Sequence, residues 1–241
     1  NSQGNVTRMC LGIQGTVDLR SHPQCEEALH EMMRCSRNFR GVRAAGPFDE
    51  DFKKGFRLLE QNQLIYDVWH YPKKEEPEAR IGELPKLTSL AKEFPNVTIV
   101  LNHLGGAVGP HLSEAAVKRW REALVDLAAC SNVYCKVGGI QMVVNGFQLE
   151  AREVPVGSEE LLELVFPWYE HAIKTFGTKR CMFESNFPAD KDCVGYGTVW
   201  NTFKRIATRM NMSEEEKSEI FHDTGFKVYM LKSEGDYTPR L

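Results

Sequence analysis

Six short segments rich in β-branched and aromatic residues recur along the chain, and each is followed by a longer segment with helical character. Their first residues lie about 24 to 48 positions apart, which is the spacing of strand–helix units. Because a helical crossover lets the next strand run in the same direction, this alternation predicts a parallel sheet in an α/β fold. The expected strands are Gly15–Leu19, Phe39–Arg43, Leu64–His70, Thr98–His103, Val133–Val137 and Cys181–Asn186.

Helix signals separate these segments. Ser, Glu and Gly residues stand where helices begin and end, and an S-x-x-E capping box precedes the last helical segment. The clearest expected helices cover 113–129, 158–177 with a break or restart at Pro167, and 213–231. The pattern leaves open whether the sheet is doubly wound or closed into a barrel. The glycine-rich stretch 103–109 has the wrong spacing for dinucleotide binding.

Composition excludes several classes of protein. The formal net charge of −3 and the isoelectric point near 6.2 argue against nucleic-acid binding, which requires a clustered basic face. No apolar run is long enough to predict a membrane span. The seven cysteines are odd in number and form no CxxC pair, so we expect a reducing compartment, the cytoplasm.

Polar residues stand at the carboxyl end of every expected strand. Active sites of parallel α/β folds form at this end, and strands buried on both faces are otherwise nearly all apolar. Each such residue taken alone is more often a satisfied group of the core, but their convergence predicts one shared site. They are Asp18, Arg43, Asp67 with Trp69 and His70, Asn102 with His103, Lys136, and Glu184 with Asn186.

Side-chain alternation assigns some of these residues to a face of the sheet. A charge that faced the helix layer would be buried without solvent or a partner, at a high cost in free energy. We therefore expect Asp67, Lys136 and Glu184 to point into the barrel interior.

Four segments, in order, carry a resemblance to a known family. The chain reads FRGVR at 39–43, VLNHLGG at 100–106, NVYCKVGG at 132–139 and RCMFESNFP at 180–188, and YML follows at 229–231. These resemble the amidohydrolase-2 family of the amidohydrolase superfamily, in its lactonase-like branch, which includes fuconolactonase and 2-pyrone-4,6-dicarboxylate lactonase. The resemblance covers roughly residues 12 to 231 and implies a (β/α)8 TIM barrel.

By this resemblance the six strands are strands 3 to 8 of the barrel, and the first two strand–helix units are lacking. We expect an N-terminally incomplete barrel domain over 1–232 and a loose tail over 233–241. The family's first strand ends in a His-x-His pair, which this chain does not contain. Family zinc sites use that pair with a histidine matching His103, so a zinc-like divalent ion is expected in a complete barrel rather than in this chain.

The resemblance also assigns expected roles. The family usually has aspartate at the position of Asn186, and an amide cannot take up a proton. We therefore hypothesise that Glu184, one pleat deeper, supplies the carboxylate, directly or through a water held by Asn186. His103 would polarise the carbonyl or accept a proton. Lys136 would stabilise an oxyanion, bind a hydroxyl or pair with Glu184. The expected substrate-binding residues are Arg43, Trp69, Asp67 and His70.

These expectations favour a hydrolase that opens a lactone or ester of a small sugar acid or aromatic acid by attack of an activated water. Two alternatives stay open: a related decarboxylase, and a non-catalytic barrel protein. The expected partner is a small-molecule substrate, without nucleic acid or membrane. Because an unclosed barrel exposes two strand edges, we also expect self-association into a homo-oligomer.

Overall fold

The computed structural model describes residues 10–69, 77–106 and 108–232, and it contains one sheet of six parallel strands. Each strand pairs with the next along the chain, so the order is β1-β2-β3-β4-β5-β6. The parallel sheet predicted from the alternating pattern is confirmed. The strands are β1 Ile13–Gly15, β2 Phe39–Ala44, β3 Ile65–Val68, β4 Ile99–Leu101, β5 Val133–Gly138 and β6 Cys181–Glu184.

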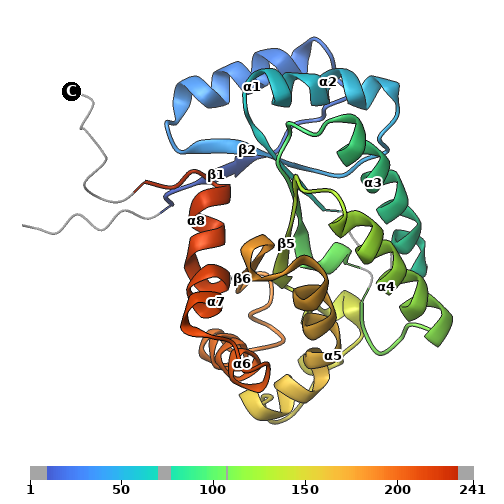
Figure 1. Cartoon of the computed structure of the whole chain (residues 1–241), viewed down its shortest axis with the longest axis vertical. Coiled ribbons are helices and arrows are strands. Elements are labelled where there is room, and N and C mark those ends of the chain that lie inside the picture. Colours follow the sequence, from blue (N-terminus) through green and yellow to red (C-terminus); the bar gives the residue numbers. More distant parts are fainter. Residues whose placement is uncertain (1–9, 70–76, 107, 233–241) are drawn as a thin grey trace, which may run out of the picture.

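The sheet curves into a half-barrel with helices around its outside (Figure 1). Within the described residues β1 and β6 are the edge strands, and no pairing joins them. This agrees with the expected TIM barrel that lacks its first two units. The helices are α1 Gln24–Cys35, α2 Glu50–Gln61, α3 Glu83–Glu93, α4 Glu114–Ala128, α5 Ser158–Phe176, α6 Tyr196–Arg209, α7 Glu214–Ser218 and α8 Thr224–Val228.

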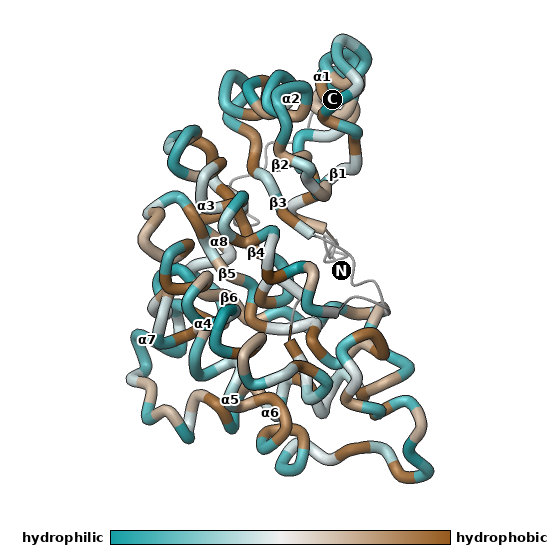
Figure 2. The backbone as a smooth tube through the Cα atoms, turned by 90° about the vertical axis from the view of Figure 1, so that its right-hand side faces the viewer, coloured by the Kyte–Doolittle hydropathy of each residue, from teal (hydrophilic) through white to brown (hydrophobic). Residues whose placement is uncertain are grey.

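Helix α2 shows how the outer layer is built. Asp49 caps it by accepting a hydrogen bond from the Phe52 backbone N–H at 2.9 Å. Phe52 and Phe56 are fully buried and pack edge-on against Tyr66 of β3. The outward turns of α1 and α2 are largely hydrophilic (Figure 2). One apolar stripe per helix therefore covers the sheet.

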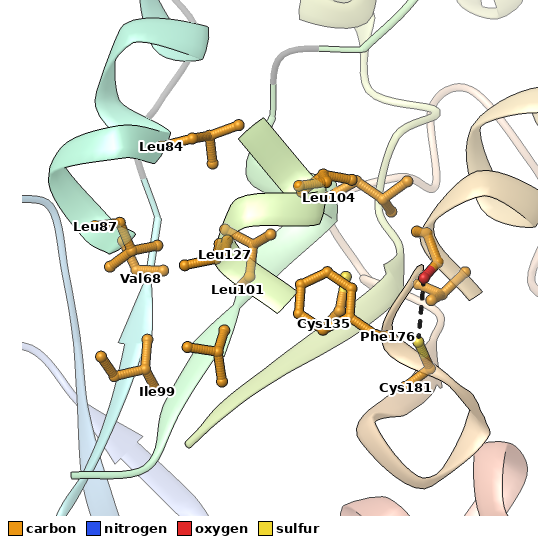
Figure 3. Packing of buried hydrophobic residues seen from close by; sticks show 14 of the residues in the cluster. Val68, Leu84, Leu87, Ile99, Leu101, Leu104, Leu127, Cys135, Phe176 and Cys181 are labelled. Atoms are coloured by element: carbon orange, nitrogen blue, oxygen red, sulfur yellow. Dashed lines mark hydrogen bonds between the residues drawn. The ribbon is translucent and has the colours of Figure 1, made fainter. Parts of the chain in front are cut away.

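The same packing continues along the sheet. Leu84 and Leu87 of α3 lie close to Val68 and Leu101 of the strands beneath them (Figure 3). The cluster is contiguous from α1 to α6 and forms the main core, between the sheet and the helices. No helix among the described residues is both long and apolar enough to cross a membrane.

The inner face of the sheet carries a second, smaller apolar cluster. Ile65, Val100 and Met182 pack there against Val228 of α8. Helix α8 contacts β6, and the Tyr229 carbonyl that follows it accepts a hydrogen bond from Arg40 Nε at 2.7 Å. The C-terminal helix thus covers the floor of the half-barrel interior.

The first strand differs from its prediction. It spans Ile13–Gly15 and not Gly15–Leu19, so Asp18 does not end a strand. Instead, Asp18 Oδ1 accepts the Arg20 backbone N–H at 3.0 Å and its carbonyl accepts the Ser21 hydroxyl at 2.6 Å. This local turn competes with strand pairing, and buried Leu19 packs in the core from the turn.

The predicted helices over 113–129 and 158–177 are confirmed, but Pro167 does not break α5. Pro167 and Glu163 both lie on the exposed side of the helix, where water can solvate the carbonyl that proline leaves unpaired. The capping box at Ser213 is present. The last helix is interrupted by a π-helical turn at Glu219–Asp223 and ends at Val228. The expected tail over 233–241 lies outside the described residues.

Candidate active site

The carboxyl ends of β2 to β6 bring most of the predicted site residues together. Side-chain alternation predicted that Asp67, Lys136 and Glu184 share the inner face. Their contacts agree with this, since Lys136 Nζ lies 2.8 Å from Asp67 Oδ2 and 3.9 Å from Glu184 Oε2. His103 and Arg43 join them from the ends of β4 and β2. Predicted site residue His70 lies outside the described residues.

His103 is at the centre of the site. It lies two residues after the end of β4 in a left-handed conformation, φ 51°, and its side chain is 1% exposed. Its Nδ1 lies 2.6 Å from Glu184 Oε1, and its Nε2 lies 3.1 Å from Arg43 Nη2. Since a guanidinium can only donate, a neutral His103 accepts through Nε2 and carries its proton on Nδ1, where the Gly138 carbonyl accepts it at 3.3 Å beside the Glu184 carboxylate.

A glycine makes room for this histidine. Gly139, at φ 69°, follows β5, and a Cβ at this position would overlap His103 Nδ1. The preceding Gly138 carbonyl lies 3.3 Å from the same nitrogen. The sequence Gly138-Gly139 therefore lets the β5 backbone approach His103 closely.

Glu184 is ionised in this setting. Burial raises its pKa, but the neighbouring His103, Lys136 and Arg43 together outweigh burial and lower the pKa to about 2. A carboxylate with so low a pKa is a weak base at neutral pH. It is suited to orienting His103 and to stabilising a positive charge there.

Asp67 forms a separate cluster with Lys136 and Tyr229. The Tyr229 hydroxyl lies 2.9 Å from both carboxylate oxygens of Asp67, whose side chain is 1% exposed. Burial and the neighbouring Asp67 carboxylate raise the pKa of Tyr229. Sequence analysis missed Tyr229 in the site, since nothing local shows that α8 folds into the interior.

Trp69 lies along one side of the site, next to His103. Its ring meets the His103 imidazole edge-on, with centroids 4.4 Å apart. The guanidinium of Arg43 lies 5.4 Å from the ring centroid, and that of buried Arg80 lies 5.3 Å from it. Arg80, in the 3-10 helix Pro77–Gly82, was not predicted. Trp69 is half-buried and is positioned by cation–π contacts from both arginines.

Asn186 is held by a residue that sequence analysis also missed. Its Nδ2 donates to Asp190 Oδ1 at 2.7 Å, and Asp190 is fully buried. Burial raises the pKa of Asp190 to about 6. The signal was present, because an aspartate four residues after Asn186 can reach it across a turn.

The donors at this site do not fit a zinc ion by themselves. Zinc requires three or more nitrogen, sulfur or carboxylate ligands around a common point, and the described residues contain no such group. His103 Nε2 faces the positive charge of Arg43, and Asn186 offers an amide where relatives are expected to carry a carboxylate.

Comparison with known proteins identifies the family to which the fold and the strand motifs belong. The family model described as Amidohydrolase matches residues 13–231, which confirms the resemblance seen in the strand motifs. The uncharacterized protein y4mH of Sinorhizobium fredii is 33% identical over 237 residues, or 91% of this chain and 70% of the relative. The L-fucono-1,5-lactonase of Burkholderia multivorans is 28% identical over 193 residues, or 78% of this chain.

The chain spans only 58% of that lactonase. Among solved structures, a zinc-bound amidohydrolase from Burkholderia multivorans superposes with a TM-score of 0.74 at 27% identity. The match covers 92% of this chain and 74% of the other. The half-barrel therefore corresponds to the larger part of an amidohydrolase barrel.

Proposed function

Because the chain belongs to the amidohydrolase family, we propose that it hydrolyses the lactone or ester ring of a small sugar acid or aromatic acid. The observation that carries the proposal is the placement of His103 between Glu184 and Arg43, at 2.6 Å and 3.1 Å. This arrangement provides a base held by a carboxylate and, next to it, a cation for the carbonyl oxygen.

His103 is the general base of the proposed reaction. The Gly138 carbonyl accepts the Nδ1–H and the Glu184 carboxylate lies on the same side of the ring, so the lone pair of Nε2 points away from both, toward Arg43. Water attacks the ring carbonyl carbon and gives a proton to Nε2. The imidazolium that forms is stabilised by the Glu184 carboxylate, in the manner of the carboxylate–histidine pair of hydrolytic triads.

Arg43 is the proposed electrophile. In the structure it donates to the nitrogen that must accept the proton, so substrate binding has to draw it onto the carbonyl oxygen. There its planar, permanently charged group stabilises the oxyanion of the tetrahedral intermediate. As the ring C–O bond breaks, His103 returns its proton to the leaving alkoxide, and a hydroxy acid is released.

The remaining predicted residues have supporting parts in this proposal. Trp69 offers a ring face to the substrate, next to His103. Lys136 is directed mainly to Asp67, 2.8 Å away, and acts on the reaction through the field it exerts on Glu184 at 3.9 Å.

Two similar proteins support the substrate class. The relatives from Burkholderia multivorans and Scheffersomyces stipitis are an L-fucono-1,5-lactonase and an L-rhamnono-gamma-lactonase. The chain covers 58% and 54% of their lengths, so activity on a sugar lactone is part of this proposal. The seven free cysteines support a reducing compartment, and we propose the cytoplasm.

Glu184→Gln tests the proposal. The purified protein is assayed with L-fucono-1,5-lactone and L-rhamnono-gamma-lactone by the acid released. The variant keeps the shape of Glu184 but removes its charge, so we expect kcat to fall by about 10²- to 10⁴-fold. Glu170→Gln, at a half-exposed ion pair on α5, is the control and should hydrolyse like wild type. Full activity in Glu184→Gln would overturn the mechanism.

A further inference from the structure

We propose that Asp190 is a positioning residue: it turns the Asn186 side chain so that its carbonyl oxygen, and not its NH2 group, holds the attacking water. This inference rests on the proposed hydrolytic function and adds to it an orienting pair that the mechanism above does not use. It also gives a reason for an amide where the family resemblance leads one to expect an aspartate.

The contact with Asp190 sets the orientation of the Asn186 amide. Asn186 Nδ2 donates to Asp190 Oδ1 at 2.7 Å. An ionised carboxylate can only accept, so the nitrogen end of the amide faces Asp190 and the oxygen end is turned away from it. No described residue donates to Asn186 Oδ1, which leaves this oxygen available to accept a hydrogen bond from water.

Asn186 lies close in sequence to Glu184, the partner of the proposed base. It stands two residues beyond Glu184, just after β6, in a left-handed conformation with φ 55°. Glu184 is the residue that holds His103. The same strand end therefore presents the partner of the base and, next to it, a hydrogen-bond acceptor for water.

The Asp190 carboxylate is poorly satisfied by the fold around it. It is 0% exposed, and its Oδ2 has no hydrogen-bond partner among the described residues. A buried oxygen without a partner costs free energy, so its presence calls for an explanation, and a role in catalysis is one. The turn around Asp190 is held by its backbone carbonyl, which accepts from the N–H groups of Cys193 and Val194 at 3.0 Å. The turn does not depend on the carboxylate.

The amide oxygen then does what a carboxylate would do for the water, apart from taking its proton. It accepts one O–H of the water and directs the other O–H toward His103 Nε2. An Asn186 amide that had rotated would present N–H donors and hold the water in the wrong orientation. The effect of this pair should therefore appear in kcat rather than in KM.

Three variants test this pair, with lactone hydrolysis measured as kcat and KM. Asp190→Leu frees the amide to rotate, and we expect kcat to fall about 10- to 100-fold with KM unchanged within about twofold. Asp190→Asn keeps an acceptor oxygen and should retain most activity. The double variant Asn186→Asp with Asp190→Leu has an acceptor in either rotamer, so it should recover kcat relative to Asp190→Leu. Asp190→Ala replaces the leucine variant if that one fails to fold.

Unchanged kcat in Asp190→Leu, an effect confined to KM, or no recovery in the double variant would overturn the proposal. A readout independent of activity is the side-chain NH2 signal of Asn186 in ¹⁵N NMR, assigned by its loss in Asn186→Asp. Its hydrogen exchange should be slow in wild type and at least about tenfold faster in Asp190→Leu. Fast exchange in wild type would overturn the pair even if no lactone is hydrolysed, whereas slow exchange without hydrolysis would count against the proposed function alone.

Discussion

Two buried carboxylates near the carboxyl ends of the strands differ in how well they are satisfied. Asp67 is bonded at both oxygens, by Lys136 at 2.8 Å and by Tyr229 at 2.9 Å. Asp190 is at least as deeply buried, but only one of its oxygens has a partner in the described chain. Most buried polar groups in native proteins are fully bonded, and one that is not calls for an explanation, such as a role in catalysis. The Asp67 cluster is therefore interpreted as a brace, and the His103 and Asn186 side as the reactive part.

The difference also bears on Lys136, for which stabilising an oxyanion, binding a hydroxyl and pairing with Glu184 were predicted. As a brace residue it is a structural cation whose closest partner is Asp67, with Glu184 more than 1 Å farther away. Substitutions in the brace should lower stability, and substitutions in the reactive part should lower activity with little loss of stability. Variants of each group can test this division between the brace and the reactive part.

The largest expected effect is on catalysis. His103→Gln removes the base but keeps a polar side chain of similar size, so kcat for lactone hydrolysis should fall by about 10²- to 10⁴-fold. The midpoint of urea unfolding should change little. His222→Gln, at an exposed histidine on the π-helical turn, is the control for both measurements. A large loss of stability in His103→Gln would place this histidine in the brace.

Lys136→Met should give the largest loss of stability. It leaves the Asp67 carboxylate, 1% exposed, without its cation, so the free energy of unfolding should fall by about 3 kcal/mol. Lys174→Met removes an exposed i,i+4 pair with Glu170 and should change it by less than about 0.5 kcal/mol. Equal stability of the two variants in urea titrations would contradict the brace.

In Asp190→Asn, the free-energy cost of the unpaired Asp190 oxygen should appear as a change in the pH dependence of stability. The folded pKa of about 6 lies above the ordinary value of 3.8, so the group favours the fold below pH 4, and this contribution is lost as the pH rises through 6. Relative to wild type, the variant should gain about 2 to 3 kcal/mol between pH 4 and pH 7. Parallel pH–stability curves from urea unfolding would show that Asp190 carries no such cost.

The smallest expected effect is that of Tyr229→Phe, which removes one hydroxyl from the brace and leaves Lys136 in place. A hydrogen bond to a charged group is worth roughly 1.5 to 3 kcal/mol, so unfolding should become easier by about 2 kcal/mol. Tyr196→Phe, at an exposed tyrosine on α6, should have no effect. A loss larger than that of Lys136→Met would mean that the hydroxyl, rather than the cation, dominates the brace.

Much of the fold could be predicted from sequence because strand–helix alternation is a local signal. The pattern predicted six strands and located the last five, and the polar residues at their ends include Arg43, His103 and Glu184, which the structure brings together. The first strand was misplaced because Asp18 forms a turn inside an apolar run. Local pattern gives the type of an element more reliably than its boundaries.

The rest of the site depends on contacts that no local pattern encodes. Tyr229 reaches Asp67 across 162 positions of sequence, and the packing of α8 into the interior decides that contact. Arg80 reaches Trp69 from a short 3-10 helix, and its role depends on the direction of one long side chain. Asp190 could have been found from its spacing to Asn186, but its burial could not, because burial is a property of the whole fold.

The contact between Tyr229 and Asp67 has a consequence for synthesis on the ribosome. Asp67 is made early, but two of the hydrogen bonds that satisfy it come from a residue 162 positions later, and the backbone of that residue binds Arg40 across 189 positions. Contacts at such separation form late, because the loop between them must be closed first. A nascent chain that stops before residue 224 lacks both α8 and Tyr229, so Lys136 is the partner left to Asp67 and the half-barrel floor is uncovered. The interior is therefore completed later than the outer helices α1 to α6, which precede α8 in the sequence.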